Sequence, residues 1–122
     1  LYEDSNTLPV PHAEPGATGL ELLLSLALKW STETDAGLLR ALTVLTNAPA
    51  QVMGSALGTL EASIGRLAEG GVADLCIFDP AATWTVQADT LRSQGKHTPF
   101  SGYELPGRVR TTIVGGQVAF DA

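Results

Sequence analysis

The sequence is poor in the side chains from which most catalytic and metal centres are built. Its 122 residues include one cysteine and two histidines. A single cysteine excludes a disulfide framework within the chain and a cysteine-rich zinc module. That cysteine, Cys76, lies in an apolar run from Ala73 to Phe78, which predicts a buried and unreactive thiol.

Basic residues and long apolar runs are also scarce. Seven Lys and Arg against thirteen Asp and Glu give a net charge of -6, without a basic patch. We therefore expect neither nucleic acid nor an anionic membrane surface as a partner. No apolar stretch approaches the roughly 20 residues of a membrane span, and no signal peptide is recognisable. The expected location is the cytoplasm.

The residue pattern offers no catalytic centre. A binuclear hydrolase site needs several histidines, a bridging carboxylate and an Asp base that converge on one water. His12 and His97 are far apart and lie in no HxH or HxxxH spacing, so each is interpreted as a surface or hydrogen-bonding residue. The sequence also lacks a nucleophile elbow, a P-loop and a GxGxxG motif. We therefore expect no catalytic residue and no metal ligand in this chain.

Helical periodicity dominates residues 18–58, after a proline-containing segment, 1–17, that is expected to be an extended loop. The first helix is predicted from Thr18 or Gly19 to Trp30, with Thr18 as its cap and Glu21 at the capping-box spacing. This helix is apolar around most of its circumference, which favours a helix from a larger layered or barrel fold. The alternative is a buried central helix of a small domain.

Two more helices are predicted before residue 65. The second spans 35–45 with Thr34 or Asp35 as its cap. The third follows Thr46 or Asn47 and ends near Gly58, with Met53 in its core-facing set.

From residue 65 onward the pattern changes to short strands. Runs at 73–78, 83–86, 109–114 and 117–120 predict a small antiparallel unit whose edges are left open. The pair Gly115-Gly116 predicts a hairpin turn. The connection at about 87–108 has no strong period and is expected to be a cover loop anchored by Phe100 and Tyr103.

Four segments together carry a family resemblance: Glu-Pro-Gly-Ala-Thr-Gly-Leu-Glu at 14–21, Gly-Arg-Leu-Ala-Glu-Gly-Gly-Val-Ala-Asp-Leu at 65–75, Gly-Lys-His-Thr-Pro-Phe-Ser-Gly-Tyr at 95–103 and Thr-Ile-Val-Gly-Gly at 112–116. In this order and spacing they resemble the C-terminal end of dihydroorotases, which belong to the metal-dependent amidohydrolases. The resemblance covers essentially the whole chain. His97 departs from the Asn-Thr-Pro-Phe usual in that family.

The resemblance implies an α/β fold in which this chain is a C-terminal fragment of a TIM-like (β/α)8 barrel and its small β-sandwich. Residues 1–64 would be the end of the barrel, with the substrate loop and three helices. Residues 65–122 would be the C-terminal strands of the sandwich, with the cover loop at about 87–108. Asp74 is expected to fix a turn or a backbone amide.

The implied activity is the reversible cyclisation of N-carbamoyl-L-aspartate to L-dihydroorotate in pyrimidine synthesis. Zinc would belong to the full-length protein, which would be a homo-oligomer, and none is expected on this fragment, which should be inactive alone. By the resemblance, Pro15 and Gly16 would bind the substrate through backbone groups. Glycine suits such a close approach, although a plain turn is the competing interpretation.

Two other readings stay open. One is a non-catalytic, dihydroorotase-like subunit that scaffolds aspartate transcarbamoylase. The other is another cyclic amidohydrolase, such as a hydantoinase or allantoinase, against which the Thr-Pro-Phe segment at 98–100 argues.

Overall fold

The computed structural model describes residues 16–122. A 3-10 turn, Leu20–Leu22, leads into α1 (Leu23–Glu33). The helices α2 (Leu38–Leu45) and α3 (Asn47–Met53) and a 3-10 segment, Gly54–Leu60, follow. The strands are β1 (Leu75–Thr85), β2 (Glu104–Val114) and β3 (Gln117–Asp121), with a short 3-10 turn, Ala88–Thr90, between the first two. None of the helices in residues 16–122 has the length and hydropathy needed to cross a membrane.

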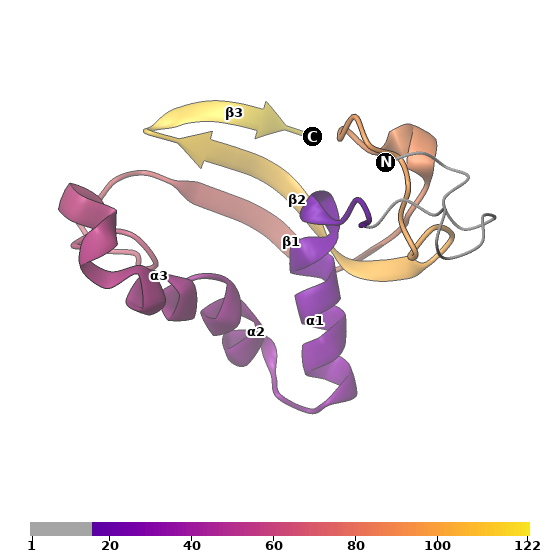
Figure 1. Ribbon diagram of the computed structural model, residues 1–122, viewed down its shortest axis with the longest axis horizontal. Coiled ribbons are helices and arrows are strands. Elements are labelled where there is room, and N and C mark those ends of the chain that lie inside the picture. Colours follow the sequence, from indigo (N-terminus) through magenta and orange to yellow (C-terminus); the bar gives the residue numbers. More distant parts are fainter. Residues whose placement is uncertain (1–15) are drawn as a thin grey trace.

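The three strands form one antiparallel sheet in the order β1-β2-β3 (Figure 1). The sequence predicted two separate strands at 73–78 and 83–86, but β1 is continuous across Asp79-Pro80. The pairing with β2 is irregular between Asp79 and Thr83. There Asp79 Oδ1 accepts hydrogen bonds from the amides of Ala81 and Ala82 at 3.0 and 3.2 Å. The carboxylate thus satisfies backbone groups that the irregular pairing leaves free.

The predicted hairpin at Gly115-Gly116 is confirmed. Both glycines have positive φ, +56° and +80°, which suits the tight turn between two antiparallel strands. Asp74 Oδ1 accepts a hydrogen bond from the Gly115 amide at 2.8 Å. The expectation that Asp74 fixes a backbone amide is therefore confirmed as well.

The helices join the sheet through α1, which packs on β2, while α2 packs on α1 and α3 on α2 (Figure 1). Ser25 Oγ donates to the Gly107 carbonyl at 2.9 Å. Trp84 Nε1 lies 3.0 Å from Ser25 Oγ and 3.1 Å from the same carbonyl. Gly107 has φ +85°, and a Cβ there would collide with the Leu28 side chain. Glycine therefore permits both the backbone turn and the close approach of the helix.

Two predicted helix starts are wrong. Thr18 does not cap the first helix, because the N-cap position of its opening turn is occupied by Gly19, which has no side chain. Asp35 lies just after the end of α1 instead of starting the next helix. Its φ is +55°, and the Ala36 amide donates to the Ser31 carbonyl at 2.9 Å, as in a helix C-terminal cap. The second helix consequently begins at Leu38, after Gly37 with φ +82°.

The predicted burial of Met53 and Cys76 is also wrong, since both are exposed. The core of the described residues lies elsewhere, at the junction of α1 with the sheet and the connection after β1. It consists of Leu22, Val86, Leu91 and Leu105, with Leu26, Trp84 and Phe100 packed against them. Partial desolvation raises the pKa of the Cys76 thiol, which keeps it in its unreactive form.

Replacement of Gly107 tests the junction between α1 and β2. We expect Gly107→Ala to lower the free energy of unfolding by at least about 2 kcal/mol, because the new methyl group is strained at positive φ and also overpacks Leu28. Gly102→Ala is the matched control, since Gly102 has φ +83° but open space around it. Its cost should be about 1 kcal/mol. Urea denaturation measures both, and equal losses would contradict the packing role of Gly107.

Candidate functional site

Gly16 is the one described residue of the predicted substrate-binding pair. Pro15 lies outside the described residues. Gly16 is exposed and has φ +101°, a conformation that side-chain-bearing residues rarely adopt. Its backbone amide and carbonyl are therefore accessible to a ligand from a direction that no Cβ obstructs.

The chain just after Gly16 is tied to the connection between β1 and β2. The Thr18 amide donates to the His97 carbonyl at 2.6 Å. Gly95 lies against Thr18 so closely that a Cβ on it would stand 2.6 Å from Thr18 Oγ1. The bond to His97 uses its backbone carbonyl and does not require a particular side chain at that position.

Glu21 makes the second tie to the same connection. Its Oε1 accepts from the Arg92 amide at 2.9 Å, and its Oε2 accepts from the amide and hydroxyl of Ser93 at 2.8 and 2.7 Å. Glu21 was expected to complete a capping box with Thr18. Instead its carboxylate receives donors that lie 71 and 72 residues away along the chain.

The environment of Glu21 favours its charged form. Desolvation acts to raise the pKa of Glu21, but the hydrogen bonds from Arg92 and Ser93 and the positive charge of Lys96 outweigh it. The pKa of Glu21 is therefore below its usual value. Lys96 also donates to the Leu91 carbonyl, which closes the segment 91–96 on itself.

The Thr-Pro-Phe segment forms a turn that covers the core. Thr98 is buried, and its Oγ1 accepts from the Phe100 amide at 3.2 Å. Phe100 packs on the core and meets Tyr103 edge to face, with ring centroids 5.6 Å apart. Backbone hydrogen bonds from Val86 to Tyr103 and from Gly102 to Val86, both 2.8 Å, close the turn. The aromatic pair thus anchors this connection, and β2 begins at Glu104, within the range expected for the loop.

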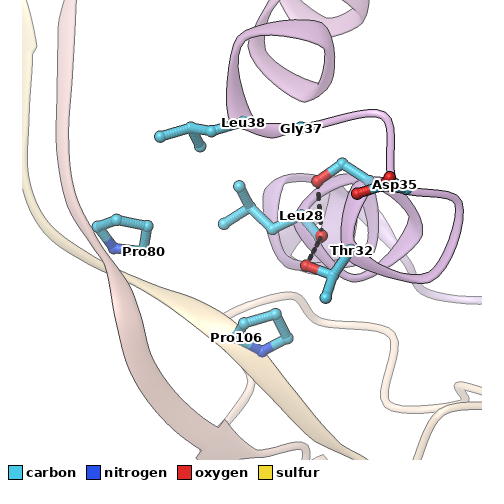
Figure 2. Close-up of a pocket in the computed structure, with 8 residues that line it drawn as sticks. Leu28, Thr32, Asp35, Gly37, Leu38, Pro80 and Pro106 are labelled. Carbon is cyan, nitrogen blue, oxygen red and sulfur yellow. Dashed lines mark hydrogen bonds between the residues drawn. The ribbon is translucent and has the colours of Figure 1, made fainter.

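A cavity of about 280 Å³ lies at the opposite end of α1, between that helix, the start of α2 and the sheet (Figure 2). It is lined by Leu28, Ser31, Thr32, Asp35, Gly37, Leu38, Pro80 and Pro106. The hydroxyl groups of Ser31 and Thr32 both donate to the Leu28 carbonyl within the helix. Asp35 is then the one charged group in the lining, which is too little for catalysis.

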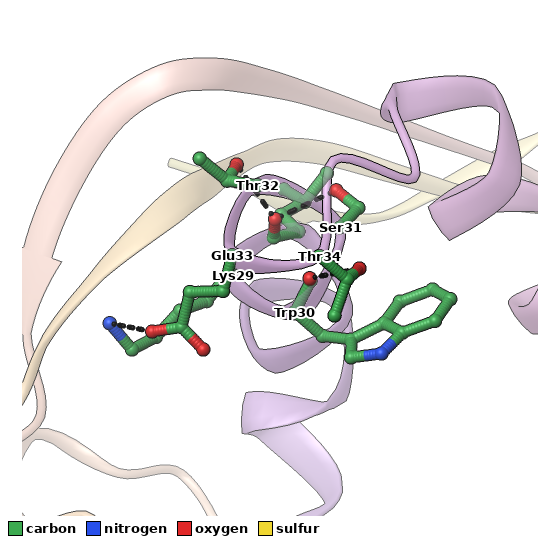
Figure 3. A network of polar contacts seen from close by, with 7 residues as sticks. Lys29, Trp30, Ser31, Thr32, Glu33 and Thr34 are labelled. Carbon is green, nitrogen blue, oxygen red and sulfur yellow. Dashed lines mark hydrogen bonds and ion pairs between the residues drawn. The ribbon is translucent and has the colours of Figure 1, made fainter.

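The last turn of α1 beside that cavity is a structural network (Figure 3). Thr34 Oγ1 donates to the Trp30 carbonyl at 2.8 Å, and Lys29 pairs with Glu33 at 2.9 Å on the exposed side. The Trp30 carbonyl thus accepts both the amide and the hydroxyl of Thr34 at the end of the helix, and the ion pair lies on its outer face. These contacts bring no group toward a ligand.

The described residues do not fit a zinc centre. Within residues 16–122, no three His, Cys, Asp or Glu side chains come together in a way that could hold a metal ion. His12, the other histidine of the chain, lies outside the described residues. What the described residues do show beside Gly16 is the pair of contacts by which Thr18 and Glu21 hold the 92–97 segment.

Comparison of the sequence with known proteins identifies the family of the chain. The model of one amidohydrolase family matches residues 31–120. The chain belongs to the amidohydrolase family. A dihydroorotase of Geobacter metallireducens is 38% identical over 117 residues, which cover 96% of this chain and 26% of the relative. A dihydroorotase-like protein of Pseudomonas aeruginosa is also 38% identical, with 97% and 26% covered. The chain thus spans about a quarter of the length of the curated relatives it matches.

Solved structures agree on the fold. A D-hydantoinase structure superimposes with a TM-score of 0.82 and 22% identity, covering 98% of this chain and 25% of that one. A D-hydantoinase from Thermus sp. gives a TM-score of 0.79, also at 22% identity, with the same coverage. The helices and strands of the chain are therefore arranged as in these hydantoinases. The family match and the dihydroorotase relatives confirm the predicted family resemblance.

Acid titration tests the role of the Glu21 carboxylate. The folded-state pKa of Glu21 lies below its usual value of 4.5. The carboxylate should therefore stabilise the fold fully at pH values well above 4.5, and this stabilisation should be lost as the pH falls through the lowered folded-state pKa. At pH 7 we expect Glu21→Gln to cost on the order of 1 kcal/mol, after allowance for solvent screening.

Thermal unfolding of wild type and Glu21→Gln between pH 7 and pH 3 measures this effect. The difference between the two proteins should shrink toward acid pH. Glu33→Gln removes the same charge at the end of α1, where the carboxylate makes an exposed pair with Lys29, and should cost little at any pH. A difference between wild type and Glu21→Gln that stays constant down to pH 3 would contradict the carboxylate's role.

Proposed function

We propose that the chain is the C-terminal part of a dihydroorotase, a cytoplasmic enzyme that interconverts N-carbamoyl-L-aspartate and L-dihydroorotate. The observation that carries this proposal is the 38% identity to a curated dihydroorotase across 96% of the chain. The amidohydrolase family and a cyclic amide substrate are supported by the family match and by the hydantoinase-like fold. In this proposal residues 1–64 complete a (β/α)8 barrel and residues 65–122 complete a small sandwich.

This chain would contribute substrate binding rather than the chemical step. The polar backbone groups of Gly16 would hydrogen-bond the dihydropyrimidine ring, together with those of Pro15. Fixed donors and acceptors of this kind orient a ligand without loss of side-chain entropy. Since residues 16–122 bring together no three side chains that could hold a metal ion, we derive no step through a metal from this chain. Zinc, if the full-length protein holds it, would lie on other parts of that protein.

Exposed apolar side chains support the proposal that the rest of the protein covers this part. Leu39 in α2, Val52 in α3 and Leu67 after the 3-10 segment Gly54–Leu60 are each at least 80% exposed. In all, fourteen large apolar side chains of the described residues are at least 40% exposed, and apolar surface of this extent is commonly covered by another part of a protein or by a partner. In a chain about four times as long, these residues would pack on the preceding elements. The full-length protein would also form a homo-oligomer.

A second candidate is a non-catalytic subunit that scaffolds aspartate transcarbamoylase. Sequence similarity does not separate it from an enzyme, because a dihydroorotase-like protein of Pseudomonas putida is 40% identical over 94% of the chain. The full-length protein should therefore be assayed for bound zinc and for hydrolysis of dihydroorotate, hydantoin and allantoin. Metal with turnover of dihydroorotate supports the first proposal. A folded, metal-free and inactive protein that co-purifies with the transcarbamoylase supports the second, and preference for hydantoin or allantoin would overturn both.

Replacement of Gly16 tests substrate binding. In the full-length protein we expect Gly16→Ala to lower kcat/KM for dihydroorotate about 10-fold, since the methyl group disfavours φ +101° and displaces one backbone contact to the ring. Gly102→Ala also places alanine at positive φ, in the turn whose Gly102 amide donates to the Val86 carbonyl, and should leave kcat/KM within about twofold. Steady-state kinetics on purified proteins measure both, and equal effects would count against a binding role for Gly16.

A further inference from the structure

We propose that Glu21 is a positioning residue, which sets the conformation of the substrate-binding backbone at Gly16 through the segment 92–97. This inference rests on the proposed function. It begins from the unusual use of the Glu21 carboxylate, which accepts three hydrogen bonds from Arg92 and Ser93 and none from its own helix among the residues described. An acidic residue in the first turn of a helix commonly serves the helix end, whereas this one holds a distant loop.

A short chain of contacts leads from Glu21 through residues 92–97 to Thr18, next to Gly16. Glu21 fixes the backbone at 92–93, and four residues later the His97 carbonyl accepts the Thr18 amide at 2.6 Å. Thr18 is two residues from Gly16. The segment 92–97 thus lies between two anchors on the same stretch of chain, 18–21, and a closed ring of contacts results.

Two features make this ring rigid. Gly95 has no room for a Cβ beside Thr18, so the two segments are in direct contact between the anchors. On the far side, the Arg92 guanidinium stacks 4.8 Å from the centroid of the Phe120 ring in β3, which attaches the segment to the sheet. A displacement of the backbone at 92–93 is therefore expected to move Thr18 as well.

The consequence for catalysis concerns binding rather than the chemical step. Backbone groups bind a ring well only if they are already held in the bound conformation, because ordering them on binding costs affinity. Loss of the Glu21 carboxylate should loosen residues 16–18 while leaving other parts of the protein unchanged. We therefore expect KM to rise with little change in kcat.

Glu21→Gln in the full-length protein tests this. Glutamine keeps the size of the side chain but offers one acceptor oxygen in place of two, so the donors of Arg92 and Ser93 cannot all be satisfied. We expect KM for dihydroorotate to increase about 3- to 10-fold, with kcat within about twofold of wild type. Ser93→Ala removes the hydroxyl donor alone and should shift KM in the same direction by less. Glu33→Gln, at the other end of α1, should leave both constants unchanged.

Hydrogen exchange of the peptide that contains Thr18 gives a second readout, which does not depend on activity. The Thr18 amide should exchange faster in Glu21→Gln than in wild type, and at the wild-type rate in Glu33→Gln. An unchanged Thr18 exchange rate, or an unchanged KM in a folded and active Glu21→Gln protein, would overturn the inference. If Glu21→Gln does not fold, Ser93→Ala carries the same test.

The two proposals fail in different ways. A wild-type protein without dihydroorotase activity sinks the proposed function, and with it the substrate role of the Glu21 tie, while the exchange measurement still decides whether Glu21 controls residues 16–18. An active wild type with unaltered kinetics in both variants sinks the positioning role alone.

Discussion

The helices meet the sheet at Gly107, where Ser25 Oγ and Trp84 Nε1 converge on one backbone carbonyl. The contact depends on a position that carries no side chain, since Leu28 of α1 occupies the space where a Cβ would stand. Three polar groups satisfy one another there, away from water, which is the condition for burying them at low cost. With α1 fixed on β2, the turn at 20–22 is brought over Leu105 and Val86, and the core closes around Leu22.

The candidate site depends on that placement. Once the start of α1 lies beside the connection between β1 and β2, the Glu21 carboxylate can reach the amides at 92–93, and Thr18 can reach His97. Neither tie would exist if α1 were rotated or shifted along the sheet by one turn. The ties at Glu21 and Thr18 therefore depend on the packing of α1 at Gly107, which is distant from both in the sequence.

Sequence reasoning succeeded where the signal is local. The Gly115-Gly116 hairpin, the fixing of a backbone amide by Asp74 and the family membership all follow from residues adjacent in the chain or from motifs of fixed spacing. It failed where partners are distant. Thr18 and Glu21 have the spacing of a capping box, but Glu21 accepts from Arg92 and Ser93 and the Thr18 amide donates to His97, which no local pattern reveals. Asp35 suits a helix start by residue type, yet the chain must reverse there, and aspartate tolerates the positive φ. The contribution of Ser93 and Gly95 to the site was likewise missed, because each acts only through its contact with 18–21.

The exposure of Met53 and Cys76 has a similar origin. Apolar character predicts burial only when a covering layer exists, and the described residues supply one for α1 but not for α3 or for the start of β1. The chain spans about a quarter of its relatives' length. This supports the proposal that those surfaces face the remainder of a longer amidohydrolase.

The most direct test of the account is a crystal structure of the full-length protein with dihydroorotate bound. The account predicts that the ring lies within hydrogen-bonding distance of the Gly16 backbone, that Glu21 still accepts the amides at 92–93, and that the metal ligands come from outside residues 16–122. A ring bound away from Gly16, with those ties intact, would contradict it.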